Sequence, residues 1–160
     1  MRIKKRPARE RVFPKVQSAV SKTRKAAIAL LALYVLFILW KTVFSRTPDE
    51  TLSYTRPLWK FYSYHFLIYG FTDIVPNIVL NILFFVPFGF LLAAAIGGEG
   101  WKTFALTVLP ALALSVAIEF TQLYFKLGKF ELDDIVNNTL GAALGFLIYK
   151  FVYRKIKCAK

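Results

Sequence analysis

The chain is almost without cysteine and histidine, and this scarcity excludes several kinds of site. Cys158 is the one cysteine, so the chain has no internal disulfide framework and no cysteine-rich metal cluster. His65 is the one histidine, which excludes zinc motifs that are built on paired histidines. The sequence also shows no Ser/His/Asp or Cys/His set and no glycine-rich phosphate loop. Few of the common catalytic designs therefore remain open.

Acidic residues are also scarce, whereas basic and apolar residues are plentiful. The 160 residues include 9 Asp and Glu against 22 Lys and Arg, for a formal net charge of +13. Hydrophobic residues make up 57% of the chain, and its mean hydropathy is +0.50. A soluble domain of this length cannot bury so much apolar surface, so the composition indicates a small integral membrane protein.

Four apolar runs are long enough to cross a bilayer, which takes roughly 20 mainly apolar residues per helix. They cover residues 26–44, about 78–96, about 103–120 and about 135–153. Residues 57–76 are also apolar, but they are rich in aromatic rings and interrupted by charge, which is typical of an interfacial or re-entrant segment. A fifth span is the alternative. We predict an all-α integral membrane protein with about four transmembrane helices plus this aromatic segment.

The basic residues are divided unequally between the two sides of the predicted membrane. A basic arm (residues 1–25), the loop near Lys102 and a basic tail (residues 154–160, together with Lys150) share one side, whose net charge is +14 against −1 on the other. The positive-inside rule therefore predicts that both termini lie in the cytoplasm. The charge is explained by topology, so we expect no nucleic-acid partner. We expect the arm to be disordered and to contact anionic lipid of the bilayer.

Polar residues recur at one level of the three spans that form the predicted membrane core, residues 74–153. A polar group in hydrocarbon is costly unless it has a partner. Within each span the spacing of the polar residues places them on one helix face, near the external surface. They are Asn77, Asn81, Ser115, Glu119, Gln122, Asp133, Asp134 and Asn138. If these faces converge, they form an acidic, amide-rich pocket that opens to the external side.

Structural roles alone explain several of these residues. Asn81, Ser115 and Thr139 are of the type that makes hydrogen bonds between helices, and Asp133 and Asp134 suit a helix N-terminus. Gly141 and Gly145 form a GxxxG motif, which favours close helix packing or a homo-oligomer. Glu119 is harder to explain in this way, since a carboxylate at the end of an apolar span must be paired, protonated or in contact with water.

Three segments of the core resemble the VanZ-like family over about residues 74–149. They are NIVLNILFFVPFG (77–89), SVAIEFTQ (115–122) and GKFELDDIVNNTLG (128–141), in this order. The resemblance implies a small multi-pass inner-membrane protein of bacteria. The founding member of the family lowers sensitivity to the lipoglycopeptide teicoplanin without remodelling peptidoglycan termini. The family usually has Arg where this chain has Lys129 and commonly Asp where it has Glu131. Lysine cannot reproduce a bidentate arginine contact.

Three functions follow as hypotheses. In the first, which we favour, the pocket binds a cell-envelope amphiphile, a lipid-linked precursor or a glycopeptide-related ligand, with no cofactor and no metal. In the second, Glu119, Asp133 and Asp134 hold Mg²⁺ or Ca²⁺ for hydrolysis or transfer at a lipid headgroup. In the third, Glu119 relays a proton or cation in a transporter. For the first, Lys129 joins the polar residues of the spans as a ligand-binding residue. Repulsion among the acids must be offset, and we favour Lys129 for this role, with Glu119 protonated or paired with the ligand. Lys126, a divalent cation or a cationic group of the ligand are the alternatives.

Overall fold

The computed structural model describes residues 8–49 and 65–158, and within these ranges the chain forms helices and no strand. The elements are α1 (Ala8–Leu39), a short π-helix η1 (Trp40–Phe44), α2 (His65–Ile96), α3 (Trp101–Tyr124) and α4 (Leu132–Cys158). Four segments are long and apolar enough to cross a membrane: Lys22–Phe44, Val75–Ile96, Trp101–Tyr124 and Leu132–Cys158. The prediction of an all-α, multi-pass membrane protein with four spans is confirmed.

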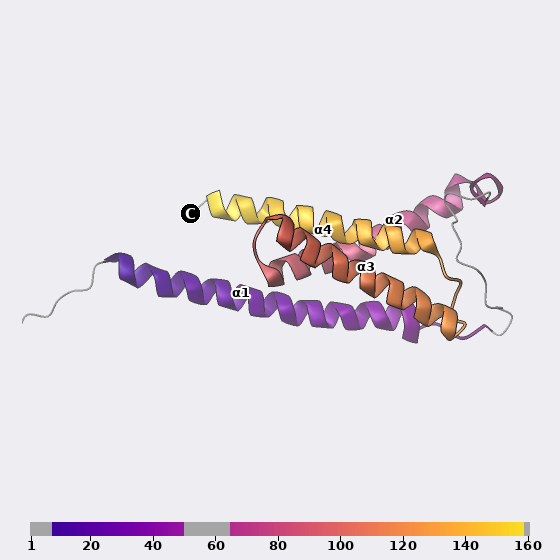
Figure 1. Cartoon of the computed structure of the whole chain (residues 1–160), viewed down its shortest axis with the longest axis horizontal. Coiled ribbons are helices and arrows are strands. Elements are labelled where there is room, and N and C mark those ends of the chain that lie inside the picture. Colours follow the sequence, from indigo (N-terminus) through magenta and orange to yellow (C-terminus); the bar gives the residue numbers. More distant parts are fainter. Residues whose placement is uncertain (1–7, 50–64, 159–160) are drawn as a thin grey trace, which may run out of the picture.

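The helices lie side by side and alternate in direction (Figure 1). The start of α1, the turn between α2 and α3, and the end of α4 lie at one end of the bundle, which we call the termini end. Residues 45–49 and the connection 125–131 lie at the opposite end, the loop end. The start of α1 and the end of α4 therefore lie on the same side of any membrane that the four spans cross.

The basic arm and the aromatic segment 57–76 can be compared with their predicted structures where the structure describes them. Residues 8–25 of the basic arm are helical and belong to α1, so the prediction of a disordered arm is wrong there. Residues 15–25 contain no glycine or proline, so nothing stops the helix of the apolar run from extending backwards. Of the aromatic segment 57–76, residues 57–64 lie outside the described residues, and residues 65–76 form the first part of α2.

Three glycines bring α2 and α4 into backbone contact. A Cβ atom at Gly141 would collide with the Ile82 carbonyl oxygen, and one at Gly145 with the Val86 carbonyl oxygen. On the facing helix, a Cβ at Gly89 would collide with the backbone of Ala142. Small residues allow this approach in a membrane, where close packing replaces the hydrophobic effect as the force between helices. Gly141 and Gly145 are thus occupied within the chain and are not available for the homo-oligomer contact that we considered.

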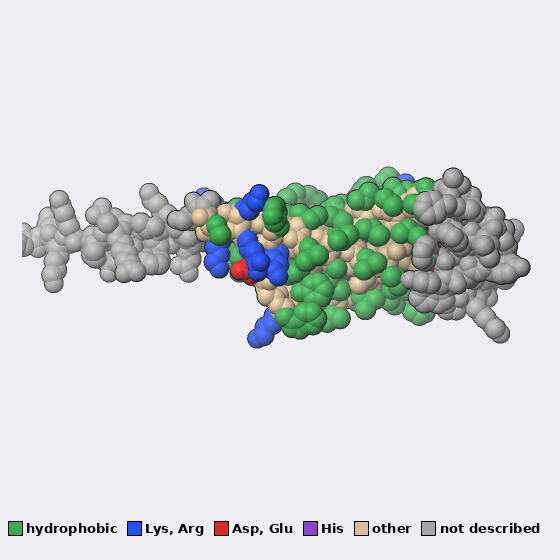
Figure 2. Space-filling model, turned by 90° about the horizontal axis from the view of Figure 1, so that it is seen from above, with side chains coloured by type: hydrophobic (Ala, Val, Ile, Leu, Met, Phe, Trp, Pro, Cys, Tyr) green, Lys and Arg blue, Asp and Glu red, His purple; other side chains and the backbone are tan. Residues whose placement is uncertain are grey.

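Helix α1 packs against the remaining helices mainly through its last turns. Ile38 is buried against Phe85 and Phe88, and the Tyr34 hydroxyl donates a hydrogen bond of 2.7 Å to the Phe84 carbonyl oxygen of α2. Most other large side chains between residues 28 and 37 of α1, Leu33 among them, are exposed. The apolar outer surface of the bundle is visible in Figure 2. It is the surface that four spans present to lipid tails.

The termini end is held by charged contacts around a glycine turn. Gly97 and Gly98 have φ values of 78° and 95°, which side chains disfavour, and so end α2 sharply. Arg24 donates to the Ala95 and Ile96 carbonyl oxygens at 2.9 and 2.8 Å, which satisfies acceptors left free at the end of a helix. Figure 2 shows Lys and Arg gathered beside an acidic side chain at this end.

The acidic residue of the termini end, Glu99, gives a pH-dependent prediction. It accepts a hydrogen bond of 2.5 Å from Arg154, and this bond, with the charges of Arg154, Lys157 and Lys150, lowers its pKa below 4.5. A lowered pKa stabilises the fold above the unfolded value, and the stabilisation is lost as pH falls through the folded value. Because the pair is solvent-accessible, the effect is small.

The measurement is the melting temperature of the detergent-solubilised protein against that of Glu99→Gln. We expect a slightly higher value for the unmodified chain at neutral pH and no difference at a pH below the folded pKa of Glu99. A difference that persists unchanged in acid would contradict the assignment.

Candidate functional site

Buried polar side chains gather in the half of the bundle nearest the loop end. On α3, Ser115, Glu119 and Gln122 are 0, 2 and 3% exposed, and on α4 Asn138 is 7% exposed. They lie at positions that sequence reasoning assigned to one level of the membrane. Together with Asn81, Asp134, Thr42 and Arg46, whose contacts are described next, we call these residues the polar cluster.

Two hydrogen bonds in the polar cluster join helices through side chains. Asn81 of α2 donates to an Asp134 carboxylate oxygen of α4 at 2.6 Å, and Asn138 of α4 donates to the Ser115 hydroxyl of α3 at 2.9 Å. The structure thus brings together polar faces of all three core helices. The bonds also perform the interhelical role that we considered for Asn81 and Ser115.

Glu119 lies deepest among the charged groups of the cluster. Its Oε2 accepts a hydrogen bond of 2.8 Å from the Glu131 backbone N–H, which ties α3 to the segment that leads into α4. Among the described residues, the charged groups that act on it are Asp134, Glu131 and Arg46. The prediction that Lys129 offsets the charge of Glu119 is wrong, because Lys129 is exposed on the loop and Arg46 supplies the nearby cation.

The segment that follows α1 completes the cluster. Gln122 donates to the Thr42 carbonyl oxygen of η1 at 3.0 Å, and the Arg46 guanidinium donates to the Leu127 carbonyl oxygen at 3.3 Å. The Asp49 backbone N–H donates to the Lys126 carbonyl oxygen at 3.0 Å. Residues 42–49 therefore lie against residues 122–127 as a strap, which fastens α1 to the α3–α4 connection.

The remaining predicted residues occupy different surroundings. Asn77 is exposed on α2, whereas Asp133 is 6% exposed in the first turn of α4. Among the described side chains no three of the types His, Cys, Asp and Glu are grouped so as to hold a metal ion. Every buried side-chain nitrogen and oxygen among the described residues has a hydrogen-bond partner. The buried polar atoms of the cluster therefore all take part in hydrogen bonds.

An apolar layer separates the polar cluster from the termini end. On the side of Ser115 that faces the termini end, four apolar residues are buried together: Phe85, Phe88, Ala111 and Ala142. Thr107, on the other side of this layer, donates to the Thr103 carbonyl oxygen of its own helix at 2.7 Å. The described polar groups therefore do not form a continuous line across the bundle.

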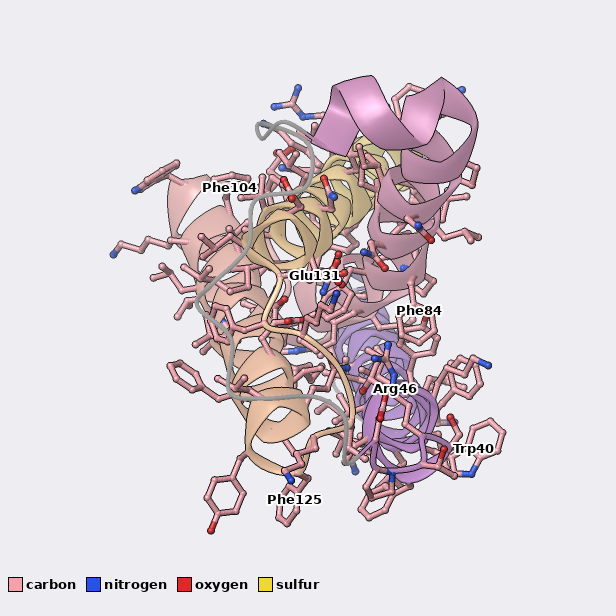
Figure 3. All side chains as sticks on the ribbon, turned by 90° about the vertical axis from the view of Figure 1, so that its right-hand side faces the viewer. Trp40, Arg46, Phe84, Phe104, Phe125 and Glu131 are labelled. Carbon is pink, nitrogen blue, oxygen red and sulfur yellow. The ribbon has the colours of Figure 1, made fainter. Side chains whose placement is uncertain are left out.

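Sequence reasoning missed Arg46 and Thr42. Figure 3, which looks onto the loop end, shows Glu131 between the helices and Arg46 beside α1. Arg46 carried one usable signal, since it follows the end of the first span by two residues and so lies at the predicted level of the polar residues. Its contact with Leu127 links residues 81 positions apart, which no local pattern reveals.

Comparison with known proteins assigns the chain to a family. The sequence model of the family described as VanZ/LLP1 matches residues 27–153, which is most of the chain. The chain belongs to the VanZ/LLP1 family. Among curated VanZ/LLP1 relatives, Protein VanZ of Enterococcus faecium is 29% identical over 126 residues, which cover 75% of this chain and 71% of that protein. No solved structure matches the chain.

The VanZ/LLP1 match is wider than the three motifs from which the resemblance was inferred. It begins at Ala27, in the first turns of the α1 span, and so includes Thr42 and Arg46. The VanZ/LLP1 unit therefore comprises all four spans, and the strap from α1 belongs to it.

Proposed function

We propose that this VanZ/LLP1 protein lowers the sensitivity of a bacterium to lipoglycopeptides such as teicoplanin, and that it acts by binding a cell-envelope amphiphile or lipid-linked precursor at the polar cluster. Membership of the VanZ/LLP1 family supports the proposed effect on teicoplanin sensitivity. The observation that supports the polar cluster as the binding site is Glu119, an acidic side chain that is 2% exposed at the loop end of a membrane bundle. A buried acidic group of this kind is costly in a bilayer and is typical of functional sites in membrane proteins.

Binding explains the geometry better than the two alternatives do. A transporter needs a route between the two sides, and the layer around Ala111 interrupts the polar groups. A metal-dependent enzyme of the kind first considered needs Glu119, Asp133 and Asp134 around one ion, and these described carboxylates do not form such a group. A binding site needs only an accessible edge, which the exposed Arg46 and Lys129 provide at the loop end.

Expression in a teicoplanin-susceptible bacterium tests the proposal. We expect the minimum inhibitory concentration of teicoplanin to rise relative to cells with an empty vector, and to rise less for an analogue that lacks the acyl chain. The acyl chain matters because the proposed ligand lies at the membrane surface. An unchanged inhibitory concentration, with the protein present in the membrane fraction, would refute the proposed function.

We further propose that both termini are cytoplasmic in the inner membrane, so that the loop end faces outward and the basic arm meets anionic lipid. The charge division between the two ends supports this orientation. In cells that carry Lys129→Cys together with Cys158→Ser, an impermeant thiol reagent should label the protein before lysis. Labelling that requires lysis would show the opposite orientation.

A further inference from the structure

Arg46 is the most exposed charged residue of the polar cluster. The first span ends at Phe44, so the guanidinium lies where the headgroups of a bilayer begin. The side chain is exposed, yet it is also fixed, since it donates to the Leu127 carbonyl oxygen at 3.3 Å. The Nη1 atom of the guanidinium thus donates to the protein, and the five N–H donors of an arginine are arranged in a planar fork.

Gly128 makes room for this arrangement. A Cβ atom at Gly128 would lie 2.8 Å from the Arg46 Nη1 atom and 3.6 Å from the Gln122 Oε1 atom. The first distance is too short for a nonbonded contact, and the second is ordinary. An added methyl group would therefore displace the flexible end of Arg46 and leave the backbone and Gln122 in place.

We propose that Arg46, positioned by Leu127 and Gly128, binds the phosphate group of an amphiphile at the loop end. A guanidinium matches phosphate with paired hydrogen bonds, and its depth matches that of headgroup phosphates. The inference rests on the proposed function for the place of the ligand and adds its chemistry. Two sources carry this chemistry at a bilayer surface, a bulk phospholipid and a polyprenyl phosphate.

Binding to the purified full chain in uncharged detergent tests this proposal, with titration calorimetry as the measurement. The probes are farnesyl phosphate, farnesol, phosphatidylglycerol and inorganic phosphate. We expect farnesyl phosphate to bind more tightly than farnesol or inorganic phosphate. Arg46→Lys, which keeps the charge and loses the fork, should weaken that binding about tenfold, the effect of one lost charge-assisted hydrogen bond. Gly128→Ala should weaken it in the same direction.

The chain offers a matched control for each change. Arg154→Lys makes the same substitution at the termini end, and Gly100→Ala adds a methyl group where no atom lies within 4 Å. Both should bind as the unmodified chain does. Equal binding by Arg46→Lys and the unmodified chain would overturn the proposal, and so would equal weakening by Arg154→Lys. Tighter binding of inorganic phosphate than of farnesyl phosphate would also overturn it.

The phosphatidylglycerol arm distinguishes the sources. Binding of phosphatidylglycerol that is as tight and as dependent on Arg46 assigns the site to bulk phospholipid, and weaker binding assigns it to a polyprenyl phosphate. Failure here is separable from failure of the proposed function. Arg46-dependent binding without a change in teicoplanin sensitivity overturns only the proposed function. Changed sensitivity without phosphate binding overturns only the phosphate site at Arg46.

Discussion

Replacement of Gly145 by leucine is expected to remove most of the folded protein from the membrane. A Cβ atom at this position already collides with the Val86 carbonyl oxygen and with the backbone at Gly89 and Phe90. Backbone atoms cannot turn aside as a side chain does, so α2 and α4 must separate. The cost should exceed the roughly 1 to 3 kcal/mol of ordinary overpacking in a core. Both helices carry partners of the polar cluster, so the cluster would be lost with the interface.

The measurement is the amount of protein in the membrane fraction and its melting temperature in detergent. Gly100→Leu is the control, since it makes the same substitution where an added Cβ atom has no neighbour within 4 Å. We expect this control to remain abundant. A Gly145→Leu protein with the abundance and melting temperature of the unmodified chain would show that the α2–α4 contact is not essential.

Replacement of Asp134 by asparagine is expected to return teicoplanin sensitivity to that of cells without the protein. Asparagine retains an oxygen that accepts the hydrogen bond from Asn81, so the tie between α2 and α4 survives the change. The negative charge near Glu119 is lost, and with it the electrostatic character of the cluster. Binding should therefore fail while folding does not.

Susceptibility and membrane abundance are measured on the same Asp134→Asn cells. Unchanged resistance would remove Asp134 from the site and leave it a purely structural partner of Asn81. Loss of the protein from the membrane would likewise assign the residue to folding.

The four spans were predictable because each depends on local composition. A long run of apolar residues identifies a membrane span without reference to the rest of the chain. Polar residues at i, i+4 and i+7 of one helix lie on one face of that helix. That logic placed Ser115, Glu119 and Gln122 on one side of α3, where the structure buries all three.

The partners across helices were not predictable in the same way. The local loop pointed to Lys129 as the cation for Glu119, but proximity in sequence does not determine where a side chain points. Arg46 takes that place because the π-helix η1 and the strap bring residues 42–49 over the α3–α4 connection. Gly128 gave no sign of its role either, since the role depends on an atom of Arg46.

The teicoplanin susceptibility of cells that make Glu119→Gln tests most directly the claim that the polar cluster is a functional site. Glutamine keeps an oxygen for the Glu131 N–H and removes the acidic group, so insertion and abundance should match those of the unmodified chain. Glu99→Gln makes the identical change at the termini end, where the acid pairs only with exposed cations among the described side chains. We predict that Glu119→Gln loses the resistance and Glu99→Gln retains it. Full resistance with Glu119→Gln, at an abundance equal to that of the unmodified chain, would contradict the claim.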